Sequence, residues 1–421
     1  MAEIQPLRAL HYSLDAVESL DAVAAPPYDV IDAAMRAELA GRSPFNVVEL
    51  DLPSDDAGDP YERAGALFET WRRENIIVRD REPSIWALTQ DYTVPGTDRQ
   101  VTRHGFFARV RVADYGAGTI RPHERTQPGP KEDRLRLTRA TRANLSPIFS
   151  LFPDPENAAW AAIEPHTSVQ PFGTVTDKGG ALNKLWRIES PDTIAAVQSA
   201  LADAELLIAD GHHRYETART YAAEVGGEGE HDYVLMFLCS LSDPGLTVLP
   251  THRLLTNVKD SSGQQALRDA IKRDFEITEI SADELEPPAD APGVSVGYMD
   301  SFHKQPYRLT LRDQAIADAA MPDRPEPYRR LDTAVLETLL LGGALGMSVE
   351  DIAAKHGLAY SKNFADALDA VESGRCDAAF FMRGTPIEQV IEVAEAGQSM
   401  PPKSTYFFPK IPTGLIFNSL E

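Results

Sequence analysis

The sequence has only two cysteines, Cys239 and Cys376, and no long apolar run. Two thiols are too few for a disulfide scaffold or a cysteine-rich metal site. A membrane span needs about 18 consecutive apolar residues, and no stretch of this chain approaches that length. The first residues, MAEIQPLRALHYSLDA, also lack the apolar core of a secretory signal. We therefore expect a cytoplasmic protein in a reducing compartment, without a membrane partner.

Basic residues are scarce as well, because 41 lysines and arginines stand against 64 aspartates and glutamates, a net charge of −23. Such a negative surplus repels nucleic acids and anionic lipids, so we expect neither as a partner. The composition, 43% hydrophobic and 25% charged, is that of a globular protein. At about 150 residues per domain, a chain of 421 residues has room for two or three domains.

Strand-like and helical stretches alternate along the whole chain, which predicts an α/β or mixed α+β fold. Residues 84–94 and 104–114 have the pattern of two strands joined as a hairpin. Further elements are predicted at 193–203 (helix), 206–209 (strand), 214–225 (helix) and 377–382 (strand).

Helix starts are well marked in the C-terminal part. Residues 331–345 are strongly apolar and predict a helix, and Ser348–Asp351 has the pattern of a capping box. Thr385 precedes Pro386 and lies three residues before Glu388, which predicts a threonine N-cap with proline at the first helical position.

One basic segment interrupts the acidic chain. Residues 99–142 hold ten arginines and one lysine against four acidic residues, a local surplus of seven positive charges. Such an island can concentrate a small anion while the rest of the surface rejects polyanions. Alternatively, these arginines pair with the surplus carboxylates elsewhere. Most of the helix predicted at 131–142 is expected to be a solvated face, from which one or two basic side chains reach the site.

The most informative stretch is 207–218, LIADGHHRYETA. A strand ends at Asp210, glycine permits a tight turn, and a helix follows almost at once. The first N–H groups of a helix have no partner within the helix, and together with the helix dipole they form a site for anions. Charge-assisted donors to a phosphate would be His212, His213 and Arg214.

The sequence of this turn allows two other interpretations. In the first, Asp210 is an ordinary helix cap and the two histidines lie on the surface. In the second, the histidines bind zinc, but adjacent histidines cannot both face one ion from regular structure, and no CxxC motif supports them. We therefore favour the phosphate site.

LIADGHHRY resembles the G-x-H-R turn of the ParB/sulfiredoxin-like superfamily, which includes free-serine kinases. The whole chain resembles a bacterial and archaeal family known as domain of unknown function 1015. The motifs that carry this resemblance follow one another along the sequence: PLRALHY, APPYDVI, RPHERT, KEDRLRL, NLSPIFSLF, ADGHHRYETA, LPTHRLL and MPPKSTYFFPK. The resemblance implies an α/β fold with a ParB-like phosphate-binding strand–turn–helix and a second α/β portion.

Kinases of that superfamily need a phosphate cradle, a magnesium ligand, a carboxylate base and a pocket for the amino acid. No motif of this chain marks the base; our candidate is Glu124 in RPHERT, with His123 and Arg125 beside it, unless Glu124 only forms a structural ion pair. Asp210 is the alternative base, or a ligand of Mg²⁺. The cradle carries over to Gly211, His212, His213 and Arg214.

Two more segments hold candidate binding residues. In PPYDVI, two prolines stiffen the backbone before Tyr28 and Asp29, so this is either a rigid loop that presents Asp29 to an amine or sugar hydroxyl, or a buried turn. In the tail, GQSMPPKS matches the phosphate-loop pattern except at Pro402, whose missing N–H rules out that loop. Candidate contacts to a phosphate oxygen remain at Lys403, Ser404 and Thr405, in what is otherwise an ordinary strand.

We expect residues 1–258 to form a ParB-like phosphate-binding region and residues 259–421 a second α/β region whose tail, 400–410, returns to the site. PPYDVI, RPHERT, ADGHHRY and the KST segment would then converge. Residues 144–147 and 251–253 are secondary candidates.

The predicted function is that of a small-molecule kinase that transfers a phosphoryl group from ATP, ADP or pyrophosphate to a hydroxyl, in the first place that of free L-serine, with Mg²⁺. The alternative is a non-catalytic nucleotide sensor of the same superfamily. Sulfiredoxin-like chemistry is excluded, since His212 stands where that reaction needs a cysteine.

Overall fold

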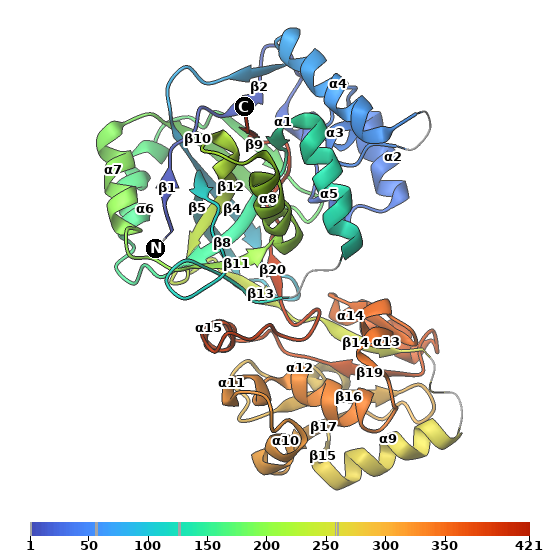
Figure 1. The fold of residues 1–421 in the computed structure, drawn as a ribbon. Coiled ribbons are helices and arrows are strands. Elements are labelled where there is room, and N and C mark those ends of the chain that lie inside the picture. The colour runs from blue at the N-terminus through green and yellow to red at the C-terminus, as the bar shows by residue number, and fades with distance from the viewer. Residues whose placement is uncertain (1, 55–57, 125–127, 257, 259–260) are drawn as a thin grey trace. The chain divides into compact units, whose positions relative to one another are not determined.

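The computed structural model describes residues 2–54, 58–124, 128–256, 258 and 261–421 (Figure 1). The chain divides into two compact units. The first unit comprises residues 1–122, 126–246 and 409–421, and the second comprises residues 123–125 and 247–408. Both contain helices and sheets, so the predicted mixed α/β class is confirmed.

Among the described residues, the main sheet of the first unit has nine strands. They are β1 (Ile4–Gln5), β4 (Ile85–Thr93), β5 (Gln100–Arg111), β6 (Ile120–Pro122), β8 (Ile148–Phe152), β9 (Gly173–Thr176), β10 (Leu182–Ile188), β11 (Leu206–Asp210) and β12 (Tyr233–Ser240). The order is β6-β11-β8-β12-β5-β4-β10-β9, with β1 paired to β5. The sheet is mixed, because β11 runs parallel to β6 and β12 parallel to β8, whereas the other pairs are antiparallel.

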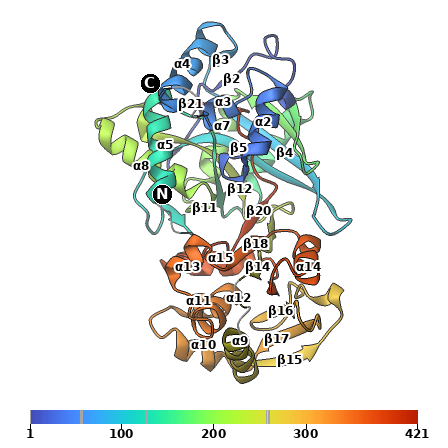
Figure 2. The same cartoon turned by 90° about the vertical axis from the view of Figure 1, so that its right-hand side faces the viewer.

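Helices surround this sheet: α1 (Leu20–Val23), α2 (Ala33–Arg42), α3 (Val48–Asp51), α4 (Pro60–Arg73), α5 (Pro128–Thr141), α6 (Ala158–Ile163), α7 (Pro191–Ala200) and α8 (His212–Val225). Figures 1 and 2 show α5 beside α8. Tyr215 of α8, Trp160 of α6 and Ile194 of α7 belong to one buried cluster with Ile208 of β11. Burying each such side chain stabilises the fold by about 1.5–3 kcal/mol, so this cluster fixes the direction in which α8 leaves the sheet.

The last residues of the chain are built into the first unit. Strand β21 (Asn418–Ser419) pairs with β7 (Ala143–Asn144), and Phe417 bridges to Leu10 in β2 (Leu10–Tyr12), which pairs with β3 (Ile77–Arg79). The Phe417 ring also packs against Tyr12 and Phe68. This anchoring fixes the segment that follows Phe408.

The second unit is built on an antiparallel sheet of six described strands: β14 (His252–Leu255), β15 (Phe275–Glu279), β16 (Ser295–Asp300), β17 (Tyr307–Leu311), β18 (Leu358–Ser361) and β19 (Ala378–Phe381). Their order is β15-β17-β16-β19-β14-β18, and β13 (Thr247–Leu249) pairs separately with β20 (Tyr406–Phe408). The helices are α9 (Ser261–Asp274), α10 (Gln314–Ala320), α11 (Glu326–Arg329), α12 (Asp332–Val335), α13 (Val349–Ala354), α14 (Phe364–Glu372) and α15 (Ile387–Glu395).

Most predicted elements are present, including the hairpin, which is β4 and β5, and the strand–turn–helix of β11 and α8. The capping box at Ser348 is confirmed. The prediction that Thr385 caps α15 is wrong, because Pro386 is the N-cap of this helix. The Thr385 hydroxyl instead donates to the carbonyl oxygen of Ser404 at 2.8 Å. The apolar stretch 331–345 is α12 followed by a π-helix, Leu336–Gly342.

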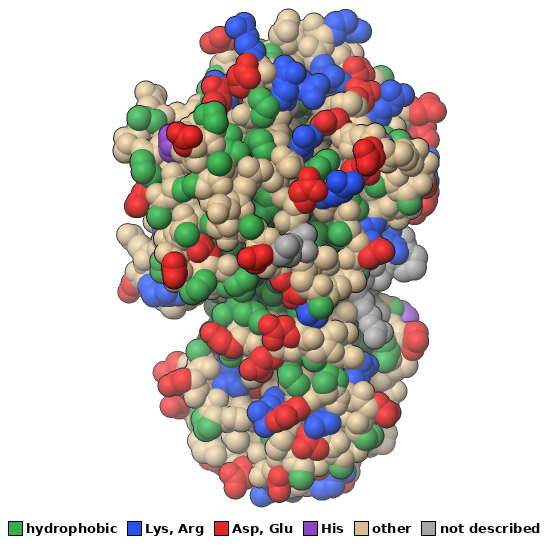
Figure 3. Space-filling model, turned by 60° about the vertical axis from the view of Figure 1, so that its left-hand side comes forward, with side chains coloured by type: hydrophobic (Ala, Val, Ile, Leu, Met, Phe, Trp, Pro, Cys, Tyr) green, Lys and Arg blue, Asp and Glu red, His purple; other side chains and the backbone are tan. Residues whose placement is uncertain are grey.

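Charge is spread over the surface. Figure 3 shows acidic and basic side chains interspersed on the face in view. Many arginines of the basic segment take up carboxylate partners, such as Arg121 with Glu205 and Arg139 with Glu224. Pairing with surplus carboxylates therefore accounts for much of the basic segment. Arg134 of this segment is buried.

Candidate anion-binding site at the β11–α8 turn

The turn between β11 and α8 depends on glycine for two reasons. Gly211 has a φ of +94°, a left-handed conformation that side chains rarely adopt. A Cβ atom there would also lie 2.9 Å from Nε of Arg214, because the guanidinium folds back over the turn. Glycine has no side chain with which to cap the helix, so the N-terminus of the 14-residue helix α8 presents its dipole to the space around Arg214.

Three charged side chains gather at this turn, and with Gly211 we call them the turn cluster: Asp210, Arg214 and Lys410. Nη2 of Arg214 lies 2.7 Å from Oδ2 of Asp210, and Nζ of Lys410 contacts Oδ1 of the same carboxylate. Burial alone would raise the pKa of Asp210, but Lys410 and Arg214 hold it below its ordinary value. The carboxylate is therefore ionised, and the cluster carries one net positive charge.

Arg214 is fixed from its other side by the segment after β7. Its Nη1 donates to the Ser146 hydroxyl at 2.9 Å and to the Pro147 carbonyl oxygen. Its Nε is buried and has no hydrogen-bond partner among the described residues. A guanidinium that is held in place and still has N–H groups without a described partner is suited to bind an oxyanion.

Lys410 reaches the turn because its backbone is held by buried side chains of the hairpin. Arg103 donates to the Pro409 carbonyl oxygen at 2.5 Å, and Gln90 donates to that of Lys410 at 3.2 Å. The Arg103 guanidinium is fully buried and lies 4.7 Å from the centre of the Phe149 ring. Burial lowers the pKa of Arg103. This arginine of the basic segment thus orders the chain that carries Lys410.

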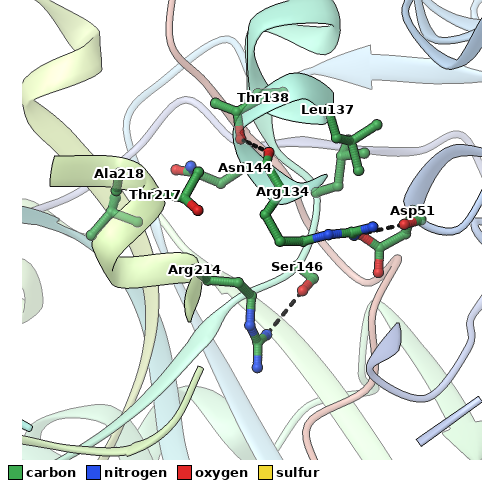
Figure 4. Close-up of a pocket in the computed structure, with 12 residues that line it drawn as sticks. Asp51, Arg134, Leu137, Thr138, Asn144, Ser146, Arg214, Thr217 and Ala218 are labelled. Carbon is green, nitrogen blue, oxygen red and sulfur yellow. Dashed lines mark hydrogen bonds and ion pairs between the residues drawn. The ribbon is translucent and has the colours of Figure 1, made fainter. Parts of the chain in front are cut away.

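A small cavity of about 40 Å³ adjoins Arg214 (Figure 4). Figure 4 shows Arg134 of α5 reaching Asp51, while Arg214 of α8 reaches Ser146. Asp51 is buried and accepts a hydrogen bond from Arg134 at 3.1 Å, but its Oδ2 has no hydrogen-bond partner among the described residues. Burial raises the pKa of Asp51, and Arg134 opposes that rise.

PPYDVI lies close to this cavity. Arg134 sits over the Tyr28 ring, 4.1 Å from its centre, and the charges of Arg214 and Arg134 both act on the Tyr28 hydroxyl. Burial nevertheless raises the pKa of Tyr28 to about 12, so the hydroxyl is a donor at neutral pH. Asp29 is exposed on the single 3₁₀ turn Tyr28–Val30. The structure therefore brings PPYDVI and the DGHHR turn together in the first unit.

The histidines of the turn differ in exposure. His212 is buried and His213 is half-buried. His212 is near enough to Asp210 for its charge to lower the pKa of that carboxyl.

Residues 123–125 of RPHERT and the KST segment belong to the second unit, whereas Arg121 and Pro122 belong to the first. Nε2 of His123 lies 2.7 Å from the Thr405 hydroxyl, and the His123 carbonyl oxygen accepts from the backbone N–H of Met400. Ser404 is buried and hydrogen-bonded to Thr333 at 3.0 Å. Glu124 is half-buried, and Lys403 is exposed with a left-handed φ of +59°. Arg125 lies outside the described residues.

The second unit also holds a group of partly or fully buried polar side chains, which we call the strand cluster. Its members are His252 and Arg253 of LPTHRLL, Glu337 of the π-helix and Tyr360 of β18. Nη2 of Arg253 is 3.8 Å from Oε1 of Glu337, and the guanidinium lies 5.5 Å from the centre of the Tyr360 ring. Each of the four side chains has a buried polar atom without a hydrogen-bond partner among the described residues. Burial raises the pKa of Glu337 to about 7 and lowers that of His252 to about 4.

Asp210 does not fit a magnesium ligand in this arrangement, because both of its carboxylate oxygens contact cations. No group of three or more histidine, cysteine or acidic side chains within the described residues is arranged to hold a metal ion. Mg²⁺ can still be held by one or two carboxylates and by phosphate oxygens of a substrate.

Sequence reasoning missed Asp51, Lys410 and Arg103. Lys410 is the last residue of the MPPKSTYFFPK motif, so the motif could have identified it as a site residue. Only the KST part of the motif was chosen as a candidate. Asp51 follows VVEL, a short stretch with no motif around it. Only the fold brings it to Arg134.

The sequence model described as "Protein of unknown function (DUF1015)" matches residues 4–334, so the chain belongs to this family. No curated protein matches the chain. None of the described helices is both long and apolar enough to cross a membrane.

Several solved structures show a distant similarity. A conserved hypothetical protein from Pyrococcus furiosus is 16% identical, over 73% of this chain and 93% of its own, with a TM-score of 0.37. A free serine kinase in complex with AMP is 14% identical, over 73% of this chain and 92% of its own, with a TM-score of 0.37. SbnI from Staphylococcus aureus, truncated at its C-terminus, is 9% identical, over 72% and 84%, with a TM-score of 0.36.

Proposed function

We propose that this chain is a small-molecule phosphotransferase that moves a phosphoryl group from a nucleotide or pyrophosphate to the hydroxyl of free L-serine. The observation that carries the proposal is the turn cluster, where the N-terminus of α8 meets Arg214 and Lys410 around Asp210. A helix N-terminus with two fixed cations selects a phosphate. The choice of acceptor rests on the resemblance of DGHHRY to the turn of free-serine kinases.

The turn cluster would bind the donor phosphate. A phosphate oxygen accepts from an N–H of the Arg214 guanidinium that has no described partner, and it shares Lys410 with Asp210. Ser146, Pro147 and Arg103 keep both cations in place, so little reorganisation is needed when charge develops on the phosphate. Removing one such prearranged donor costs an enzyme about 10²–10³-fold in kcat.

In the transfer, the serine hydroxyl oxygen forms a bond to phosphorus and the bond to the bridging oxygen of the donor breaks. The hydroxyl proton moves to a carboxylate, for which Glu124 is our predicted base. Asp29 is the predicted partner of the serine ammonium group. Mg²⁺ would arrive bound to the donor phosphates as part of the substrate. Both carboxylate oxygens of Asp210 contact cations, so in this proposal Asp210 positions Arg214 and Lys410 and does not accept the hydroxyl proton.

The test is ³¹P NMR of the protein with Mg²⁺ and L-serine, with ATP, ADP and pyrophosphate in separate tubes. We expect a phosphoserine resonance with at least one donor and a rate lower by about 100-fold or more in Arg214→Ala. Arg139→Ala is the matched control, since it removes an arginine ion-paired on the surface of α5, and it should keep the rate. An equal rate in both variants would exclude a role of the turn.

Calorimetry separates the kinase from the nucleotide sensor. A kinase whose base is Glu124 keeps donor binding and loses turnover on Glu124→Gln. If the unmodified protein binds a donor but forms no phosphoserine from any of the three, the kinase proposal fails and the sensor is favoured.

A further inference from the structure

A cavity in the second unit is lined by no residue of the motifs used for the proposed function. Its volume is about 640 Å³, within the range of roughly 300–1,000 Å³ found for small-molecule sites. Helix α9 forms one side, and strands β15, β16 and β17 contribute residues to the other. Figures 1 and 2 both show α9 next to these strands.

Two cations line the cavity from α9. Arg268 and Lys272 are one helical turn apart, are both exposed, and form no ion pair with any described residue. On the same helix, Arg273 is paired with Asp274 at 2.6 Å. Neighbouring like charges at this spacing repel each other. In a chain with a net charge of −23, two cations that find no carboxylate are free for an anionic ligand.

Aromatic rings line the opposite wall. Tyr298 and Tyr307 are directly paired across β16 and β17, so their side chains stand on the same face of the sheet. The Tyr298 ring also packs on Phe380, with 5.3 Å between ring centres. Burial raises the pKa of Tyr298, which keeps its hydroxyl protonated, while the charge of Arg268 acts in the opposite direction. The cations and the rings therefore face the same space.

The rim of the cavity exposes apolar surface. Phe302 is 59% exposed and Ile277 is 41% exposed, and both line the cavity. They are two of only six large hydrophobic side chains so exposed in the described part of the chain. Apolar side chains gathered beside unpaired cations are typical of ligand sites.

The two aspartates that line the cavity already accept hydrogen bonds from backbone N–H groups of the protein. Asp300 accepts from the backbone N–H groups of Phe302 and His303, at 3.0 and 2.8 Å, and contacts the His303 ring. Asp377 accepts from the N–H of Val258 at 2.9 Å. Neither carboxylate forms an ion pair with Arg268 or Lys272 in the described part of the chain.

We propose that this cavity is a second binding site, for a small anion that carries an aromatic ring, of the size class of a mononucleotide. The ring lies against Tyr298 and Tyr307 under Phe302, and the anionic group lies at Arg268 and Lys272. The site does not depend on the proposed phosphotransferase activity.

The probe is AMP, titrated by calorimetry into the full-length Arg214→Ala protein, so that binding at the turn cluster is weakened. We expect one binding site. Arg268→Ala/Lys272→Ala in that background should raise the Kd by at least about 10-fold. The control, Arg273→Ala/Arg375→Ala, changes the net charge equally but removes cations of the second unit that are exposed and already ion-paired.

Two further measurements test whether the aromatic ring of the ligand contributes to binding. Phe302→Ala, an exposed position that should not affect folding, is expected to raise the Kd a few-fold. Adenosine and inorganic phosphate should each bind more weakly than AMP. The proposal is overturned if Arg214→Ala binds no AMP, if the Arg268/Lys272 variant binds AMP as the control does, or if phosphate binds as tightly as AMP. None of these results bears on phosphoserine formation, so this proposal and the proposed function fail separately.

Discussion

The turn cluster and the strand cluster each place an arginine and a carboxylate in the interior, yet their geometries differ. In the turn cluster, Arg214 and Asp210 are in direct contact at 2.7 Å and Lys410 completes the group. In the strand cluster, Arg253 and Glu337 are 3.8 Å apart, and the polar atoms Nε and Oε1 have no hydrogen-bond partner among the described residues.

The difference shows in the protonation of the two carboxyl groups. Two cations outweigh burial at Asp210 and hold its pKa down, whereas one more distant cation fails to do so at Glu337, whose pKa rises to about 7. Contact geometry thus decides whether a buried carboxylate is a fixed charge or a group that titrates near neutrality.

The largest effect on stability is expected from Asp210→Asn. This change leaves Arg214 and Lys410 as two neighbouring cations without their carboxylate, which costs about 3–5 kcal/mol when a buried pair is broken. Added pyrophosphate should restore part of the loss, because it supplies the missing negative charge. Urea unfolding with and without pyrophosphate measures both. Asp114→Asn, at the exposed partner of Arg219, is the control and should change neither.

The strand cluster should make stability depend on pH. The folded protein keeps a proton on Glu337 up to about pH 7, whereas the unfolded chain releases it near pH 4.5. The contribution of Glu337 to the free energy of unfolding is therefore present at low pH and is lost as the pH rises through 7. Relative to Glu337→Gln, the unmodified protein should lose up to about 3 kcal/mol between pH 4.5 and 8.

His252 contributes with the opposite sign. Burial lowers the pKa of His252 to about 4, so the stability that His252 contributes to the protein is present above about pH 6.5 and is lost as the pH falls. Taking the difference between the unmodified protein and Glu337→Gln, measured by urea unfolding at each pH, removes this common contribution. A flat difference would show that Glu337 does not titrate near 7.

A smaller effect is expected at the turn glycine. Gly211→Ala and Gly180→Ala both force a side chain into a left-handed backbone, at about 1–3 kcal/mol each. Only at Gly211 does the new methyl group meet a guanidinium, since Gly180 has open space around it. Both variants should lose a similar amount of stability by thermal unfolding, but only Gly211→Ala should weaken pyrophosphate binding. Equal binding by both would show that Arg214 can move without consequence.

The smallest effect concerns the two thiols, one in each unit. Cys239 and Cys376 are buried, and burial raises the pKa of Cys376 to about 11 and that of Cys239 further. Both should resist a thiol reagent in the native protein. With rising urea, Cys376 should react first, because the described apolar cluster that contains Cys376 is smaller than the one described in the first unit. Reaction of Cys239 first would reverse this order of unit stability.

Local patterns predicted the strand–turn–helix of the turn cluster well, because the strand, the glycine and the helix are all encoded within the segment 207–218. The other partners of Arg214 and Asp210 come from elsewhere. Ser146 lies in the motif NLSPIFSLF, whereas Lys410 is 200 residues from Asp210 in the sequence and reaches it only because the last residues pair with β7 and β2. Periodicity carries no information on such returns of the chain.

Capping shows the same limit on a smaller scale. Ser348 caps its helix as predicted, because both partners of the capping box lie within four residues. Thr385 has the same local pattern, but the carbonyl of Ser404 takes its hydroxyl. Glu124, Lys403, Ser404 and Thr405 stay predicted site residues, to be decided by substitution.

The most direct test of the central claim, that the turn cluster is a phosphate site, is the Kd of pyrophosphate for the unmodified protein and for Arg214→Ala, with Arg139→Ala as control. The account predicts a Kd at least about 10-fold higher for Arg214→Ala and unchanged for Arg139→Ala. Equal affinity of all three proteins, or no binding by any of them, would contradict it.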